Sequence, residues 1–194
     1  MYSELELDAL RELVNIGSGT AATALSQMLG RTIDVSVPTA AAVPLADAVD
    51  AVGEPDLVVT GVALGIVGDI EALAVVLFRE HDSTRICELL GVDPEGEFAT
   101  SALSEIGNIL CSSYLGAFAT MTGLSMEPSP PQSTTDMLGA VVATVLSLSA
   151  EDSDLALLLD SSLQIEGEDS SCIFLLVPNK AGIAELLARL GIGA

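Results

Sequence analysis

The stretch DALRELVNIGSGTAATALSQMLGRTIDVSVP, residues 8–38, decides the fold because the chain contains it twice. The second copy is SALSEIGNILCSSYLGAFATMTGLSMEPSPP, residues 101–131, and the two copies align without a gap at a constant offset of 93 positions. A repeat of this length indicates a chain built from two related structural units. Each copy predicts a long helix that is followed by a strand.

The rest of each unit follows in the same order. Apolar runs bounded by turn residues predict strands, and each unit closes on a short amphipathic helix that ends at a glycine. The predicted strands are residues 56–69 and 70–78 in the first unit and 154–167 and 171–177 in the second, and the short helices are residues 82–91 and 181–191. Residues 136–150 are predicted to form a further helix, whereas the first unit has a looser segment at residues 40–55.

These elements predict an α+β fold with an internal pseudo-twofold axis, in which a six-stranded, mostly antiparallel sheet is covered by long helices. A chain of 194 residues, 50% of them hydrophobic, is long enough for a single domain, here made of two repeats at about residues 1–93 and 94–194. The predicted core contains Leu10, Val14, Leu25, Met28, Val59, Val75, Leu77, Ile106, Leu110, Phe118, Leu159, Phe174 and Leu176.

The charge balance is strongly acidic, with 28 Asp and Glu against 6 Lys and Arg and a formal net charge of −22. Such a surface repels phosphates, so we expect no nucleic acid partner. Its simplest explanation is adaptation to the cytoplasm of a halophile, where concentrated salt screens the repulsion. Two uncharged windows, residues 13–30 and 106–126, carry polar side chains all around the helix, so we expect no membrane insertion. The sequence shows no basic leader followed by an apolar stretch, so we expect no secretory signal.

The cysteines and the histidine exclude several kinds of site. Cys87, Cys111 and Cys172 lie in apolar surroundings without a CxxC pair and are predicted to be buried free thiols. With His81 as the sole histidine, we expect neither a Cys/His metal site nor a catalytic triad with a histidine base.

A polar face recurs on the two long helices. Asp8, Glu12 and Asn15 share one side of the first helix at i, i+4 and i+7, and the second helix repeats this with Ser101, Glu105 and Asn108. Asparagine is a mediocre helix former, so its presence at both outward-facing positions indicates a use. A carboxamide accepts and donates hydrogen bonds and can hold a water, which suits hydrolysis of an acyl phosphate. One alternative is that these residues only form solvated helix faces. For Asp8 and Ser101 the other alternative is helix capping. Ser3 with Glu6 is a further candidate cap for the first helix.

The spacing of these residues resembles the signature of the CheC-type phosphatases of chemotaxis, a family that includes CheX and FliY. The pattern is Asp or Ser, three residues, Glu, two residues, Asn, 22 residues and Pro, which ends at Pro38 and Pro131. The resemblance implies dephosphorylation of the response regulator CheY. Asn15 and Asn108 would orient the attacking water, Glu12 and Glu105 would pair with a lysine of phosphorylated CheY, and Asp8 and Ser101 would lie in the partner-binding surface. Mg²⁺ would belong to CheY, so no cofactor of its own is expected, and the two prolines would shape the strand end near each site.

A second partner is implied by residues 130–143, which resemble the region of CheC that docks CheD, a receptor glutamine deamidase. Asp136 occupies the place of an acidic residue of that region. The alternative for this segment is an ordinary buried helix with a polar start. The resemblance also leaves a second function open, that of a non-catalytic adaptor which binds CheD or phosphorylated CheY.

Overall fold

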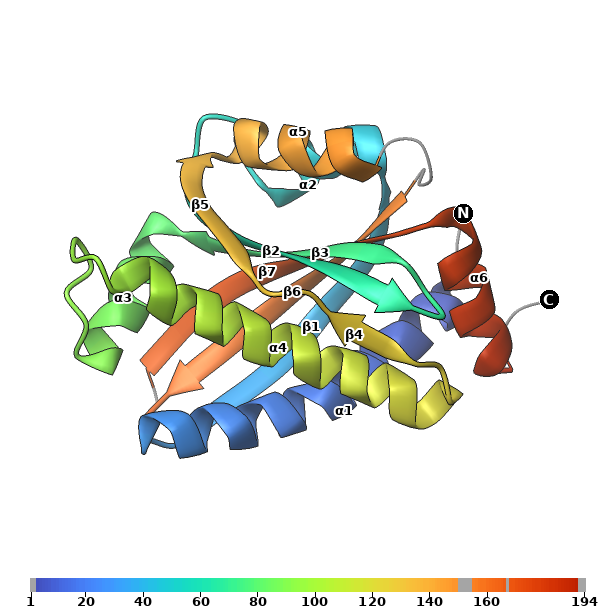
Figure 1. Cartoon of the computed structure of the whole chain (residues 1–194), viewed down its shortest axis with the longest axis horizontal. Coiled ribbons are helices and arrows are strands. Elements are labelled where there is room, and N and C mark those ends of the chain that lie inside the picture. Colours follow the sequence, from blue (N-terminus) through green and yellow to red (C-terminus); the bar gives the residue numbers. More distant parts are fainter. Residues whose placement is uncertain (1–2, 150–154, 167, 192–194) are drawn as a thin grey trace.

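Two long helices and one antiparallel sheet organise the chain, whose computed structural model describes residues 3–149, 155–166 and 168–191 (Figure 1). The helices are α1 (Glu4–Leu29), α2 (Ala48–Val52), α3 (Glu80–Leu90), α4 (Ala99–Thr122), α5 (Leu138–Ser149) and α6 (Lys180–Arg189), with a short 3₁₀ helix η1 (Leu45–Asp47). The strands are β1 (Ile33–Pro44), β2 (Val58–Gly68), β3 (Ala72–Arg79), β4 (Met126–Pro128), β5 (Gln132–Met137), β6 (Leu155–Ile165) and β7 (Glu168–Pro178).

The ends of the two long helices follow from local sequence. A capping box at Ser3 starts α1, because the Ser3 side chain accepts from the Glu6 backbone while the Glu6 side chain accepts from the Ser3 backbone. Gly30 and Gly123 end α1 and α4 in the left-handed region, at φ 64° and 73°. The alternative role of Asp8 and Ser101 as helix caps is wrong, because the N-caps are Ser3 and Phe98. The first lies in the second turn of α1, and the second lies two residues inside α4.

The sheet interleaves the two units. Its strand order is β1-β6-β7-β3-β2-β4, with β5 also paired to β2, and every neighbouring pair is antiparallel. The first strand of each unit therefore pairs with the hairpin of the other unit. In the first unit this strand is β1, which pairs with β6. In the second unit it is divided into β4 and β5, which both pair with β2. The predicted α+β fold with an antiparallel sheet is confirmed. The described residues form seven strands rather than six, because the strand after α4 is divided into two pieces at residues 129–131.

Helices cover both faces of the sheet (Figure 1). On one face α1 and α4 pack over a large core cluster that includes Val14, Leu110 and Phe174. On the other face α2 and α5 pack over a second cluster that includes Val52 and Leu175. The looser segment expected at residues 40–55 thus forms the end of β1, η1 and α2, and α2 is the counterpart of α5. The predicted helix at 136–150 starts later, at α5, because residues 132–137 pair with β2 as a strand.

The predicted core is buried except for one residue. Met28 is 43% exposed, so its placement in the core is wrong. The inward stripe of α1 passes from Leu25, which is buried, to Leu29, which is half-buried, and Met28 lies beside this stripe.

The three thiols are buried and free, as predicted. Burial raises the pKa of Cys111 to about 12, and burial also raises the pKa of Cys172. Burial also raises the pKa of Tyr114 to about 12; its hydroxyl lies 3.2 Å from the Ser161 hydroxyl. These groups fill the space between α4 and the sheet and are inert at neutral pH.

We expect the free energy of unfolding to fall as the pH rises from about 9 towards 12. The pKa values of Cys111 and Tyr114 are raised on folding from 9.0 and 10.0 to about 12, so the unfolded chain loses these protons first. The folded state therefore loses stability above the unfolded pKa values and not below them. Urea denaturation across this pH range measures the effect, and Cys111→Ala should make the fall shallower. An unchanged midpoint would contradict the expectation.

Candidate functional site

The polar face of α1 is partly occupied by its own arginine. Asp8 and Glu12 are exposed, and an Asp8 carboxylate oxygen lies 3.1 Å from the Arg11 guanidinium. The side chains of Arg11 and Asp8 are 45% and 63% exposed, so the pair contributes at most about 1 kcal/mol. It nevertheless places a cation beside Glu12 on this face.

Asn15 is tied to the neighbouring strand. It is half-buried rather than fully outward as predicted, and its Oδ1 accepts a 2.9 Å hydrogen bond from the backbone N–H of Val37. Its Nδ2 donates to the Val37 carbonyl at 3.4 Å. The carboxamide of Asn15 therefore satisfies both backbone groups of Val37 in β1.

Val37 needs these bonds because it lies in a β-bulge. Ser36 pairs with Ser162 and Thr39 pairs with Asp160 of β6, so that Val37 and Pro38 together face a single residue. The extra residue of a bulge is left out of the ladder, and here Asn15 supplies the missing partners. Pro38 thus lies within β1 at the bulge, not at the end of a strand as predicted.

The polar face of α4 has different surroundings. Ser101 and Glu105 are exposed and Asn108 is half-buried. Ser104, which aligns with Arg11, donates its hydroxyl to the Thr100 carbonyl at 2.7 Å. Among the residues that the structure describes, none forms a hydrogen bond with the carboxamide of Asn108.

The same bulge recurs in the strand after α4. The Ser129 N–H donates to the Gly65 carbonyl at 2.7 Å, and the Ser129 hydroxyl accepts from the Gly65 N–H at 2.9 Å. The ladder resumes where Gln132 pairs with Ala63. Residues 130 and 131 therefore face a single residue of β2. In the same way, residues 37 and 38 of β1 face a single residue of β6.

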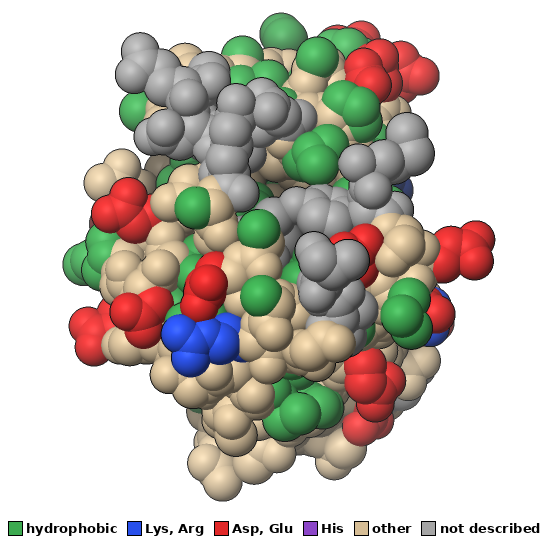
Figure 2. Space-filling model, turned by 90° about the vertical axis from the view of Figure 1, so that its right-hand side faces the viewer, with side chains coloured by type: hydrophobic (Ala, Val, Ile, Leu, Met, Phe, Trp, Pro, Cys, Tyr) green, Lys and Arg blue, Asp and Glu red, His purple; other side chains and the backbone are tan. Residues whose placement is uncertain are grey.

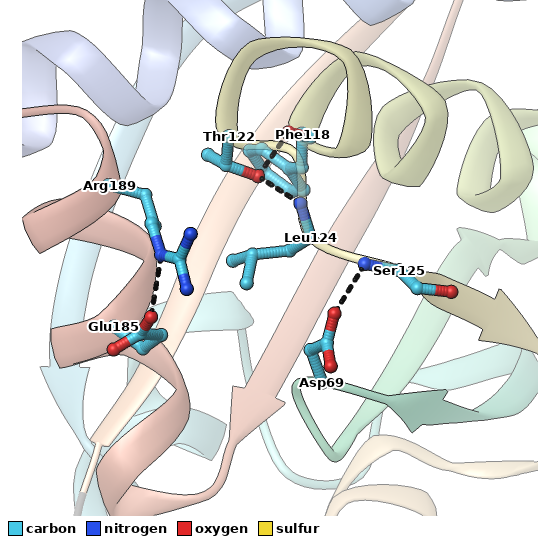
Figure 3. A network of polar contacts seen from close by, with 7 residues as sticks. All are labelled: Asp69, Phe118, Thr122, Leu124, Ser125, Glu185 and Arg189. Carbon is cyan, nitrogen blue, oxygen red and sulfur yellow. Dashed lines mark hydrogen bonds and ion pairs between the residues drawn. The ribbon is translucent and has the colours of Figure 1, made fainter.

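A network of polar contacts holds the end of α4 (Figure 3). The Thr122 hydroxyl donates to the Phe118 carbonyl at 2.6 Å and accepts from the Leu124 N–H at 3.3 Å. The Asp69 carboxylate, in the turn between β2 and β3, accepts from the Ser125 N–H at 2.8 Å. These contacts set the point where the chain enters β4, and hence the register of the second bulge.

The two polar faces lie on helices that touch. At Gly17 of α1 an added Cβ would lie 2.9 Å from both the Ser113 carbonyl oxygen and the Tyr114 Cα of α4. Such a close approach of two backbones requires glycine. The α1–α4 contact thus fixes the helices that carry both polar faces relative to each other.

Asp136 lies on β5 rather than at the start of a helix as predicted. It is exposed, and one of its carboxylate oxygens accepts from the Met137 N–H at 2.7 Å. With Val141, Thr144 and Val145 of α5 it lines a hollow of about 340 Å³ between β5 and α5. This hollow is separate from the residues of the α1 and α4 faces.

The described residues also bear on metal binding and on membrane insertion. Within them, no group of three or more His, Cys, Asp or Glu side chains is placed to hold a metal ion. None of the helices there has the length and apolar content needed to cross a membrane.

Comparison with known proteins assigns the family. The model of the CheC-like family matches residues 5–41 and 98–134, which carry both polar faces and both bulges. The CheY-P phosphatase CheC of Bacillus subtilis is 33% identical over 198 residues, which cover 97% of this chain and 95% of that protein. The flagellar motor switch phosphatase FliY of the same organism is 28% identical over 137 residues, or 67% of this chain and 35% of that protein. The crystal structure of Thermotoga maritima FliY superposes with a TM-score of 0.80 at 22% identity and covers 98% of each chain. The chain therefore belongs to the CheC-like family.

Proposed function

We propose that this protein hydrolyses the aspartyl phosphate of a CheY-type response regulator through a water that asparagine positions. The observation that carries the proposal is the α4 face, where Glu105 is exposed and the accessible Asn108 carboxamide has no hydrogen-bond partner among the described residues. The similarity to a protein named CheY-P phosphatase CheC supports the choice of substrate.

The reaction needs little chemistry from this chain. The water oxygen attacks phosphorus, the bond between phosphorus and the aspartate oxygen breaks, and the products are inorganic phosphate and the free aspartate. Since the leaving carboxylate is a good one, positioning of the water supplies most of the acceleration. The Asn108 carboxamide would hold the water in line, and Glu105 would pair with a lysine of the regulator. Mg²⁺ would belong to the regulator, so this chain would need no cofactor of its own.

The test is phosphate release from a phosphorylated CheY-type regulator. We expect the wild-type protein to accelerate release and the Asn15→Ala/Asn108→Ala double variant to leave the regulator at its own rate while still binding it. Gln27→Ala is the matched control, because Gln27 is an exposed carboxamide of α1 outside the polar face. A double variant as active as the wild type would contradict the water-positioning role.

A second candidate function is an adaptor that binds CheD. Asp136 favours it, because this exposed carboxylate lies at the hollow between β5 and α5, away from the α1 and α4 faces. We expect Asp136→Asn to weaken binding of CheD without changing phosphate release. Titration of labelled CheD measures the affinity, and equal affinities of wild type and variant would count against this surface.

The acidic surface also has a functional consequence. On the side that carries α6, acidic side chains are spread over the surface and basic ones are few (Figure 2). All five arginines already have partners: Arg11 pairs with Asp8, Arg31 with Glu166, Arg85 with Glu88 and Arg189 with Glu185, while Arg79 donates to the Val52 carbonyl. The chain has no further arginine to neutralise its acidic side chains, so the repulsion that comes with the net charge of −22 must be screened by salt ions. We propose that the protein works in the cytoplasm of a halophile.

We expect the melting temperature and the phosphatase activity to rise with KCl concentration. Screening reduces the repulsion among the acidic side chains of the chain, which stabilises the folded and active state. Thermal unfolding and phosphate release measured from low to molar KCl test this, with sucrose as the uncharged control. A steady loss of both with added KCl would overturn the halophile proposal.

A further inference from the structure

The two bulges differ at the position that bonds to the asparagine in the first copy. The first bulge is Val37-Pro38 and the second is Pro130-Pro131. We propose, on the basis of the proposed function, that Asn108 is the water-positioning residue and that Asn15 instead holds the β1 bulge. This division of labour is decided by the position that is Val37 in the first copy and Pro130 in the second.

Freeing Asn15 would leave two backbone groups of β1 without hydrogen-bond partners. Val37 is 1% exposed, and its N–H and carbonyl are both bonded to the Asn15 carboxamide. If Asn15 turned towards a water in a partner's active site, it would leave both groups unpaired beside the core. Unpaired buried backbone groups are strongly disfavoured. Asn15 is therefore held on its own strand.

Proline changes the hydrogen bonding of the second bulge. Pro130 has no backbone N–H, so the donor that holds Asn15 is missing in the second copy. The Pro130 carbonyl accepts a 3.3 Å hydrogen bond from the Ser129 hydroxyl, which takes the place of the asparagine Nδ2. The bulge after α4 is thus satisfied without Asn108, and its carboxamide is left available for a water.

Charge points in the same direction. Arg11 lies next to Glu12 on α1, whereas the aligned residue on α4 is Ser104. A partner lysine that approaches the α1 face meets a cation, and one that approaches Glu105 meets two serines instead. The α4 face is therefore the better docking site for a lysine as well as the one with the available asparagine.

The first experiment measures phosphate release in molar KCl. We expect Asn108→Ala to remove most of the acceleration and Asn15→Ala to retain most of it. Pro130→Val supplies the missing N–H and should lower kcat by roughly tenfold with KM nearly unchanged, because the docking carboxylate Glu105 is untouched. Pro128→Val is the matched control: it makes the same change two residues earlier, where the first copy already has Val35.

The second experiment reads the hydrogen bonds without the partner. Amide hydrogen exchange should show the Val37 N–H protected in the wild type and exchanging at least roughly tenfold faster in Asn15→Ala. In Pro130→Val the new amide at position 130 should be protected, and Asn108→Ala should remove that protection. This readout does not depend on any enzymatic activity.

The outcomes separate the two proposals. A wild-type protein without any effect on phosphate release would sink the proposed function, while the exchange data would still report on the bonds. An active wild type that loses equal activity with Asn15→Ala and Asn108→Ala, or that is unchanged by Pro130→Val, would overturn the division of labour. Equal rates of hydrogen exchange of the Val37 amide in the wild type and in Asn15→Ala would also overturn it.

Discussion

Gly17→Ala is expected to lower the free energy of unfolding by about 2–3 kcal/mol, because overpacking at a close backbone contact cannot be relieved by moving a side chain. The added Cβ would lie 2.9 Å from the Ser113 carbonyl oxygen and the Tyr114 Cα, so α1 and α4 must separate. Both polar faces sit on these helices, and we expect the phosphatase activity to fall as well. Urea denaturation and phosphate release measure the two effects.

Gly19→Ala is the control for this prediction. Gly19 is exposed on the same helix and nothing lies within 4 Å of its added Cβ, so alanine should stabilise α1 by about 0.5–1 kcal/mol through its higher helix propensity. Equal stabilities of the two variants would contradict a close α1–α4 contact at Gly17.

Asn15→Ala is expected to cost about 1–3 kcal/mol of stability, the penalty of leaving buried backbone groups without partners. The variant removes the 2.9 Å bond to the Val37 N–H and the bond to its carbonyl. Asn108→Ala removes no protein hydrogen bond found among the described residues, so its effect should stay within about 0.5 kcal/mol.

The pair of variants is its own control, because the same side chain is truncated at aligned positions of two similar helices. Denaturation midpoints at one KCl concentration give the comparison directly. A larger loss from Asn108→Ala than from Asn15→Ala would contradict the structural role of Asn15.

The division between the asparagines also limits what a repeated motif means. Both copies keep Glu and Asn at the same spacing, which favours two equivalent sites. A carboxamide, however, serves equally as a partner for backbone groups and as a holder of water. Which of the two it does depends on the strand opposite, and one proline is enough to change it.

Much of this protein could be predicted from the sequence by itself. The repeat with its offset of 93 residues determined the duplicated α+β architecture and the polar faces, because side chains at i, i+4 and i+7 must share one side of a helix. The apolar runs determined most of the core, and the capping box at Ser3 determined where α1 begins. These features depend on local geometry and on burial of apolar surface, which are written along the chain.

Only the tertiary structure decided how the units interleave and what each asparagine touches. The pairing of β1 with β6 and of β5 with β2 joins residues far apart in sequence, which periodicity does not report. The bulges arise from that pairing, since a residue is extra only relative to its partner strand. The Val37-Pro38 and Pro130-Pro131 pairs were visible in the aligned copies, but their meaning needed the contact between Asn15 and Val37.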